Sequence, residues 1–255
     1  MLLAVDVGNT NTVFGVFDGK DLKVSWRVST QANRSVDEYR VLLSRLFELE
    51  ELSLGAISSA IISCVVPTVL EALPVSIVKM FGLEPIVVGP GVKTGMPIFY
   101  NNPSEVGADR IVNAVAGYER FQQQTIVVDF GTATTFDCVS EKGEYLGGLI
   151  APGIHISMEA LFQFASKLPR VTLYWPDKVI GKSTVHSIQS GLLYGYVEMV
   201  DGIVRRIGRE MGGNPKVIAT GGLARLINRE ARSIHVIDEL LTLTGLRIIY
   251  ERNLA

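Results

Sequence analysis

The sequence predicts an α/β protein built from two similar halves, each a mixed β-sheet flanked by helices. The main observation is a repeat: Leu3-Ala-Val-Asp6-Val-Gly8 and Ile126-Val-Val-Asp129-Phe-Gly131 both end an apolar run in Asp-x-Gly. Small hydroxyl and amide residues follow each, and then apolar residues alternate again, which predicts strand, tight turn and strand. A second observation is that strand-like and helix-like segments alternate after each copy. Internal repetition of this kind indicates a duplicated architecture, and two such halves predict a cleft between them.

The first half has one sharply marked helix. Ser35-Val-Asp-Glu38 is a capping-box pattern, and Tyr39, Leu42, Leu43 and Leu46 then follow helical spacing, so we expect a helix to about Glu50. Pro74 should kink or split a later helix. The other expected elements are strands at 56–66 and 85–88, helices at 68–81 and 109–121, and a loop at 89–103.

The second half restarts at Thr125 with strand, hairpin and strand as far as Ala151. The polar stretch Gln122-Gln123-Gln124 marks the break, and we place the domains at 1–118 and 119–255. The elements expected after the hairpin are helices from about 154, at 187–211, 223–229 and 238–252, and strands at 216–220 and 233–236.

Composition restricts the class of protein. Hydrophobic residues are 47% of the 255, the formal net charge is −2, and basic residues are not clustered, which argues against binding to nucleic acid or to an anionic membrane. No apolar run is long enough to cross a bilayer, and no signal peptide is evident. Cys64 and Cys138 lie in apolar runs and are interpreted as buried thiols. We expect a cytoplasmic protein.

The two Asp-x-Gly turns indicate a site for a polyphosphate and its metal. The aspartates Asp6 and Asp129 are candidate metal-directed carboxylates, and hard oxygen ligands suit magnesium. The small polar residues that follow offer donors to an anion; they are Thr10, Asn11, Thr12, Thr132 and Thr134. A single turn of this kind is ordinary turn chemistry, and it is the repetition that favours a functional role.

A third motif, Thr220-Gly221-Gly222, follows a strand and precedes a helix. Glycines there allow the close approach of a nucleotide near a helix N-terminus. A plain glycine turn is the favoured explanation when the motif is taken alone, and its position after both Asp-x-Gly turns strengthens the nucleotide interpretation. Gly181-Lys182-Ser183 is no phosphate loop, because Pro176 stands where that motif needs glycine.

Gly107-Ala108-Asp109-Arg110 is the best candidate for binding an acceptor substrate. Asp109 falls where a helix should begin, and its alternative role is that of an N-cap. A carboxylate beside an arginine suits a small organic substrate, because the acid can accept a hydroxyl proton while the guanidinium binds a carboxylate or amide. At a helix N-terminus and next to Arg110, the pKa of Asp109 should fall. The histidines His155, His186 and His235 show no metal-ligand spacing.

Together these motifs resemble the actin-like ATPase and sugar-kinase superfamily, whose domains are ribonuclease H-like, and within it the type III pantothenate kinases. Gly107–Arg110 with Asp129-Phe-Gly-Thr-Ala-Thr-Thr135 points to that family, and Gly147–Gly153 also matches. The resemblance implies phosphorylation of pantothenate by ATP to 4′-phosphopantothenate, at the start of coenzyme A biosynthesis. It also implies Mg²⁺, a monovalent cation (K⁺ or NH₄⁺) and a homodimer with the acceptor site near the interface.

The resemblance assigns roles to individual residues. Asp109 is the implied catalytic proton acceptor, Asp129 the implied ligand of the monovalent cation, and Asp6 the residue directed toward magnesium through water. The implied pantothenate contacts are Tyr100, Gly107, Ala108, Asp109, Arg110 and Thr184. The resemblance leaves open whether Thr184 acts within its own subunit or across the dimer. The implied ATP contacts are Asp6, Val7, Gly8, Asn9, Thr10, Asn11, Thr12, Val13, Thr132, Gly221 and Gly222.

Three other functions share parts of this pattern. An actin-like ATPase would need both Asp-x-Gly turns but no acceptor motif, and a silent regulator on the kinase fold would have lost a motif that this chain keeps. A sugar kinase usually has a longer chain.

Overall fold

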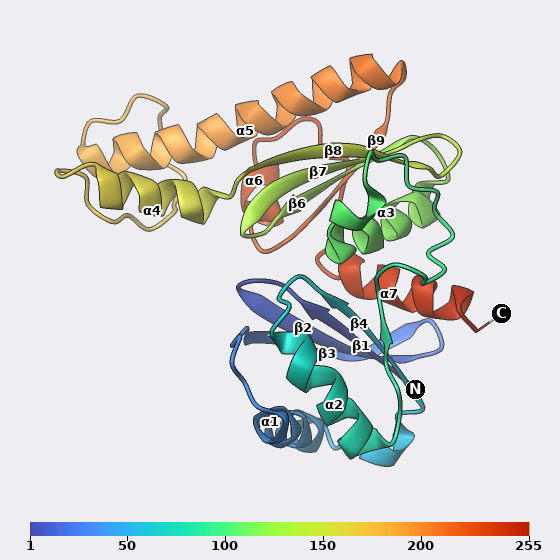
Figure 1. The fold of residues 1–255 in the computed structure, drawn as a ribbon. Coiled ribbons are helices and arrows are strands. Elements are labelled where there is room, and N and C mark those ends of the chain that lie inside the picture. The colour runs from blue at the N-terminus through green and yellow to red at the C-terminus, as the bar shows by residue number, and fades with distance from the viewer. Residues whose placement is uncertain (255) are drawn as a thin grey trace. The chain divides into compact units, whose positions relative to one another are not determined.

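The structure, a computed structural model, describes residues 1–254 and divides into two compact units. The first unit combines Met1–Ala116 with the segment from Leu240 onward, and the second is Gly117–Glu239. Each unit contains one five-stranded mixed sheet with helices against it (Figure 1).

The sheet of the first unit has the strand order β3-β2-β1-β4-β5. Strands β1, β2 and β3 are antiparallel neighbours, whereas β4 runs parallel to β1 and β5 parallel to β4. The strands are β1 Leu2–Val7, β2 Asn11–Asp18, β3 Asp21–Ser29, β4 Ser59–Cys64 and β5 Ile86–Val87.

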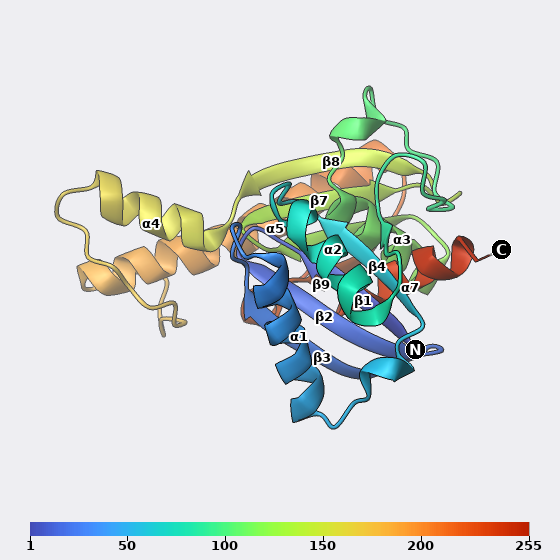
Figure 2. The same ribbon diagram turned by 60° about the horizontal axis from the view of Figure 1, so that its bottom comes forward.

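Alternation along β1 divides the two faces of this sheet. Leu3, Val5 and Val7 join the core formed with α1 (Val36–Leu49) and α2 (Val69–Phe81), and both views show these two helices along the sheet (Figures 1 and 2). The opposite face carries Asp6 and receives α7 (Leu241–Arg252). Gly15 of β2 permits this contact, since a Cβ there would lie 2.7 Å from Leu243 Cδ1.

The sheet of the second unit has the order β10-β9-β6-β7-β8, which is the same topology strand for strand. Its antiparallel and parallel pairings repeat those of the first sheet. The strands are β6 Thr125–Phe130, β7 Ala133–Val139, β8 Tyr145–Pro152, β9 Lys216–Thr220 and β10 Val236–Ile237. This equivalence confirms the duplication that the sequence predicts.

Helices of the second unit cover its sheet in a similar way. Ile126, Val128 and Phe130 pack in one core with α5 (Thr184–Met211) and α6 (Ala224–Asn228). Helix α4 (Ile154–Phe164) lies along the first part of α5 in both views (Figures 1 and 2). The other face carries Asp129 and Val127, and the last turn of α3 (Ala108–Phe121) packs there through Gly117.

Most of the predicted elements are confirmed, with three differences. The capping box of Ser35 and Glu38 is formed, and α2 runs unbroken through Pro74, so it is not split. Helix α5 begins at Thr184, earlier than predicted, because Ser183 caps it by accepting a hydrogen bond from His186 N–H at 3.2 Å. Helix α7 packs within the first unit although the sequence division at 118/119 places it in the second.

Within residues 1–254, no helix is both long and apolar enough to span a membrane.

Candidate active site

The first Asp-x-Gly turn is a tight hairpin whose tip is exposed. Gly8 N–H donates to the Asn11 carbonyl oxygen at 3.0 Å, which leaves Asn9 and Thr10 exposed at the tip. The side chain of Thr12 is buried, and its hydroxyl lies 2.9 Å from that of Thr30. Since Thr30 donates its own proton to the Gly8 carbonyl oxygen at 2.7 Å, Thr12 must be the donor in that pair. The Thr12 side chain therefore braces the turn from inside.

A buried hydroxyl stands beside Asp6. The register of β1 and β4 pairs Asp6 with Ser63, whose side chain is 0% exposed and whose Oγ has no hydrogen-bond partner among residues 1–254. An unsatisfied buried hydroxyl costs about 1–3 kcal/mol, so its retention at this corner is typical of a site that a ligand completes. A carboxylate next to a hydroxyl fits a hydrated Mg²⁺.

The second turn is one residue shorter. Gly131 N–H donates to the Ala133 carbonyl oxygen at 3.0 Å, and Thr132 is exposed at the tip. Gly153 closes one side, because a Cβ at that position would lie 2.2 Å from the Thr132 carbonyl oxygen. The Gly147–Gly153 segment and the second turn, which are separate motifs in the sequence, thus meet in the fold.

Gly221 closes another side of the same turn. Its φ is +89°, and a Cβ there would lie 2.6 Å from both Asp129 Oδ1 and the Phe130 carbonyl oxygen. Thr220 is buried and pairs with Asp129 in the register of β6 and β9. Carboxylate, carbonyl and hydroxyl oxygens therefore gather at Asp129, a donor set that fits a hard cation. The predicted contribution of a helix N-terminus after Gly222 is weak, because α6 has only five residues.

Asp109 lies in the first turn of α3. Its Oδ1 accepts a hydrogen bond from Arg110 N–H at 2.8 Å, and Arg110 itself is buried. A Cβ on Gly107 would lie 2.6 Å from Asp109 Oδ1. Glycine is thus required at 107 for the carboxylate to hold this position.

Burial raises the pKa of Asp109, against the lowering by the Arg110 hydrogen bond and charge. The expectation of a lowered pKa was wrong, because the sequence shows the charged neighbour and not the loss of water around the carboxyl group. A raised pKa makes Asp109 a stronger proton acceptor once it is ionised.

The remaining predicted contacts lie on exposed segments. Tyr100 belongs to the loop before α3 in the first unit, and Thr184 is the first residue of α5 in the second. Asp6 and Asp109 belong to the first unit, whereas Asp129, Thr132 and Gly221 belong to the second. Within each unit, the fold gathers motifs that are far apart in the chain.

Sequence reasoning missed four residues around the two aspartates: Ser63, Thr135, Asp137 and Tyr145. Ser63 is a polar residue within the apolar run of β4, and Asp137 is a fully buried acid within β7. A polar residue in an otherwise apolar strand was the available signal, but only the strand register shows what each one faces.

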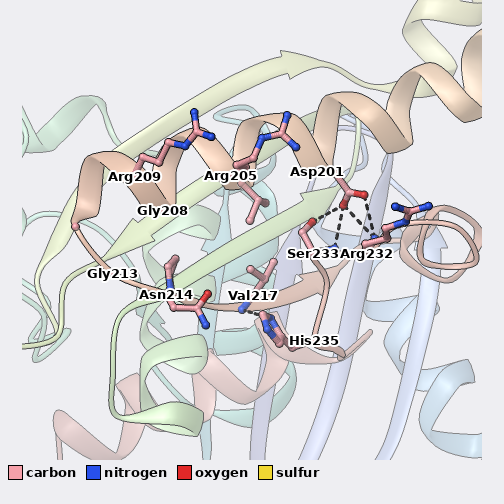
Figure 3. A pocket seen from close by; sticks show the side chains of 13 residues that line it. Asp201, Arg205, Gly208, Arg209, Gly213, Asn214, Val217, Arg232, Ser233 and His235 are labelled. Atoms are coloured by element: carbon pink, nitrogen blue, oxygen red, sulfur yellow. Dashed lines mark hydrogen bonds between the residues drawn. The ribbon is translucent and has the colours of Figure 1, made fainter.

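A hollow of about 660 Å³ on the second unit lies apart from these motifs (Figure 3). Asp201 anchors its wall by accepting hydrogen bonds from Ser233 N–H at 3.0 Å, Ser233 Oγ at 2.6 Å and Arg232 N–H at 3.1 Å. Arg205 and Arg209 extend to one side of α5, with Asn214 and His235 on the other (Figure 3). The basic groups do not converge, so this hollow is not the candidate site.

The histidines show no catalytic arrangement. His235 Nδ1 accepts a hydrogen bond from Val217 N–H at 3.1 Å, and burial lowers its pKa, with Lys216 adding to the effect. His155 and His186 are exposed. Among residues 1–254, no three His, Cys, Asp or Glu side chains are grouped so that they could hold a metal ion.

Comparison with known proteins gives a match along most of the chain. Residues 2–206 match the family model described as type III pantothenate kinase. A type III pantothenate kinase of Syntrophus aciditrophicus is 59% identical over 253 residues, covering 99% of this chain and 100% of the relative. The one of Myxococcus xanthus is also 59% identical over 253 residues, covering 99% of each.

Solved structures share the fold at low sequence identity. A conserved Baf family protein from Campylobacter jejuni superposes with a TM-score of 0.62 at 20% identity, covering 98% of both chains. The ROK hexokinase of Thermus thermophilus gives a TM-score of 0.50 at 12% identity, covering 100% of this chain and 99% of that one. The expected duplicated actin-like fold is thereby confirmed.

Proposed function

This chain belongs to the type III pantothenate kinase family, and on that basis we propose that it phosphorylates pantothenate with ATP. The product is 4′-phosphopantothenate, formed in the first step of coenzyme A biosynthesis. The observation that carries the proposal is the arrangement at the start of α3, where Gly107 makes room for the partly buried carboxylate of Asp109 beside the buried Arg110. An ATPase without an acceptor substrate does not need a carboxylate and an arginine placed together in this way.

Asp109 is the proposed proton acceptor. The primary hydroxyl oxygen of pantothenate forms a bond to the γ-phosphorus while the bond from phosphorus to the β–γ bridging oxygen breaks, and the hydroxyl proton passes to the Asp109 carboxylate. Because such transition states are loose, the proton moves late, and orienting the hydroxyl is a large part of the contribution. Arg110 holds the substrate's carboxylate, and Tyr100, Gly107, Ala108 and Thr184 are further contacts.

Backbone N–H groups and short polar side chains of the two turns are the proposed phosphate contacts. In the first turn these are residues 6–13, with Asn9 and Thr10 exposed at the tip. In the second turn Thr132 is the exposed residue, and Gly221 with Gly222 is the proposed contact of the adenosine part. Anions bind where N–H groups are unhindered and close together.

We further propose Mg²⁺ near Asp6 and a monovalent cation, K⁺ or NH₄⁺, at Asp129. When bound, these ions neutralise charge on the phosphoryl oxygens. The buried hydroxyl of Ser63 supports the first site, and the oxygen set enclosed by Gly221 supports the second.

A homodimer is the proposed assembly, with the acceptor site near the interface. Exposed apolar side chains lie on β8, on α4, just before α5 and at its start in the second unit; they include Ile150, Ile156, Phe162, Phe164, Ile180 and Val185. Large apolar residues in such number are typical of a surface that another chain covers.

We also propose a cytoplasmic location, since Cys64 and Cys138 lie on different sheets and form no disulfide.

The direct test is to incubate the protein with ATP, Mg²⁺, K⁺ and pantothenate and to look for phosphopantothenate by mass spectrometry. We expect product only when pantothenate is present, and none from an analogue that lacks the primary hydroxyl. ATP consumption that does not depend on pantothenate would instead support an ATPase. Absence of product with K⁺ and with NH₄⁺ would contradict the proposal.

A further inference from the structure

Asp137 is a buried carboxylate that lies outside the proposed phosphate, adenosine and pantothenate contacts. It lies in β7 with its side chain 0% exposed. Tyr145 Oη, equally buried, donates to its Oδ1 at 2.8 Å, and Thr135 Oγ1 donates to its Oδ2 at 3.3 Å. A buried carboxylate is costly unless it is hydrogen-bonded, and here two hydroxyl groups supply those bonds.

The strand register places Thr135 between two carboxylates. In the antiparallel pair of β6 and β7, Thr135 is directly opposite Asp129, while Asp137 is opposite Val127. Directly opposed residues point to the same face with Cβ atoms about 4.5–5.5 Å apart. Thr135 therefore adjoins Asp129 across the strands and Asp137 along its own strand.

The direction of one hydrogen bond has a consequence for Asp129. A threonine hydroxyl has a single proton and two lone pairs, and Thr135 gives its proton to Asp137. The hydroxyl oxygen of Thr135 therefore presents a lone pair, and not a proton, toward Asp129. A carboxylate facing a lone pair is a repulsive arrangement that a cation between them reverses.

The duplicated half provides an internal comparison. The residue opposite Asp6 is Val13, and the residue opposite Ala4 is Gly15, whereas the second sheet has Thr135 and Asp137 at these positions. The same strand topology forms in both units, so the fold itself needs neither the hydroxyl nor the buried acid. The two polar residues are specific to the half that carries Asp129.

We propose that Thr135 is an oxygen ligand of the monovalent cation at Asp129, and that Asp137 is its positioning residue. Asp137, held by Tyr145, takes the Thr135 proton and so turns the lone pairs of that hydroxyl toward the cation. This inference rests on the cation site of the proposed function and adds residues to it.

The test is a titration of thermal stability with KCl, at constant ionic strength made up with choline chloride. We expect K⁺ to raise the Tm of the wild-type protein, since a ligand of the native state stabilises it. Thr135→Val keeps the shape of the side chain and should raise the K⁺ concentration for the half-maximal effect by about tenfold or more, whereas Thr135→Ser should keep it near the wild-type value.

Asp137→Asn tests the positioning role. The amide can donate to Thr135 and release that proton toward Asp129, so the K⁺ requirement should rise by about tenfold while KM for pantothenate changes little. Tyr145→Phe is a milder change, for use if Asp137→Asn does not fold, and it should shift the K⁺ requirement in the same direction. Tyr118→Phe removes the Tyr118 hydroxyl, which donates to the Glu141 carbonyl oxygen at 3.1 Å, and it should leave the K⁺ requirement unchanged.

Two results would overturn the inference: a K⁺ response of Thr135→Val equal to that of the wild type, or a wild-type Tm that K⁺ does not change. Either can occur while phosphopantothenate is still formed, in which case the kinase function stands. If no product is formed but the Tm titration separates Thr135→Val from Thr135→Ser, the cation site stands and the proposed reaction fails.

Discussion

At the residue scale, two features of the Asp109 environment shift its pKa in opposite directions. Its carboxylate accepts a hydrogen bond from Arg110 N–H and lies beside the Arg110 charge, and both favour ionisation. Burial outweighs them and raises the pKa. A carboxylate that ionises less readily than in water is a better base when it does ionise, which suits a proton acceptor.

The Asp109→Asn variant should lose activity by a factor of about 10² or more while ATP still binds. In the wild type, kcat/KM should fall as the pH drops through the raised pKa, so this acid limb lies above the ordinary value of 3.8. A pH–rate profile and isothermal titration with ATP measure these effects. Near-normal turnover of Asp109→Asn would remove the residue from the mechanism.

The same substitution should raise stability at neutral pH. A carboxyl group whose pKa is raised in the folded state adds stability below its unfolded pKa and loses it as the pH rises through the folded value. Asparagine avoids this loss and can keep the Arg110 hydrogen bond, so Tm should exceed that of the wild type at pH 7 and converge with it near pH 3.8. Asp18→Asn, at an exposed site, is the matched control.

The sequence shows which residues interrupt an apolar run, but it does not show which residues face each other across neighbouring strands. Asp6 and Asp129 stand out because each ends a strand in the same motif. Ser63 gains its meaning only from Asp6, which lies opposite it, and Asp137 only from Thr135, which donates a hydrogen bond to it. The pKa of Asp109 was misjudged for a related reason, since burial is a property of the fold.

At the element scale, the second turn depends on glycines in two other segments. Gly153 follows β8 and Gly221 follows β9, and each comes close to the backbone of residues 130–132. The strands bring these segments together, so the turn has no room for further side chains. Periodicity predicted the strands, but these close contacts depend on the three-dimensional approach of their ends.

Gly153→Ala should displace the Thr132 backbone, because the new Cβ would lie 2.2 Å from its carbonyl oxygen. We expect a loss of about 1–3 kcal/mol in the free energy of unfolding and a raised KM for ATP, measured by denaturant titration and steady-state kinetics. Gly202→Ala in α5 is the control, since its Cβ meets nothing closer than 3.9 Å. It should leave KM unchanged, and equal effects of the two substitutions would contradict the argument.

At the scale of the whole molecule, exposed apolar surface on the second unit points to assembly. Phe164 is 86% exposed and Ile180 75% exposed, and further exposed apolar residues lie on α4 and at the start of α5. Single exposed apolar residues are ordinary, whereas a larger apolar surface is typical of an interaction site. The sequence implied a dimer only through its resemblance to a family. The structure supplies a surface on which such an assembly can be tested.

Phe164→Glu should convert a dimer into a monomer, because it places a charge within the apolar surface. Size-exclusion chromatography with light scattering measures the mass, and specific activity should fall if the acceptor site needs the partner. Leu49→Glu changes a residue that is 75% exposed in the first unit and should not alter the mass. A wild-type protein that is monomeric at micromolar concentration would rule out the assembly.

The placement of α7 also has a consequence for the order in which the protein can fold during synthesis. The second unit, Gly117–Glu239, is one continuous segment, so it can be complete as soon as it has left the ribosome. The first unit is begun earlier but lacks α7, which covers the face of β1 and β2 that carries Asp6 and Gly15. The half that is translated first is therefore finished last, and its uncovered sheet must stay soluble until residue 252 has been added.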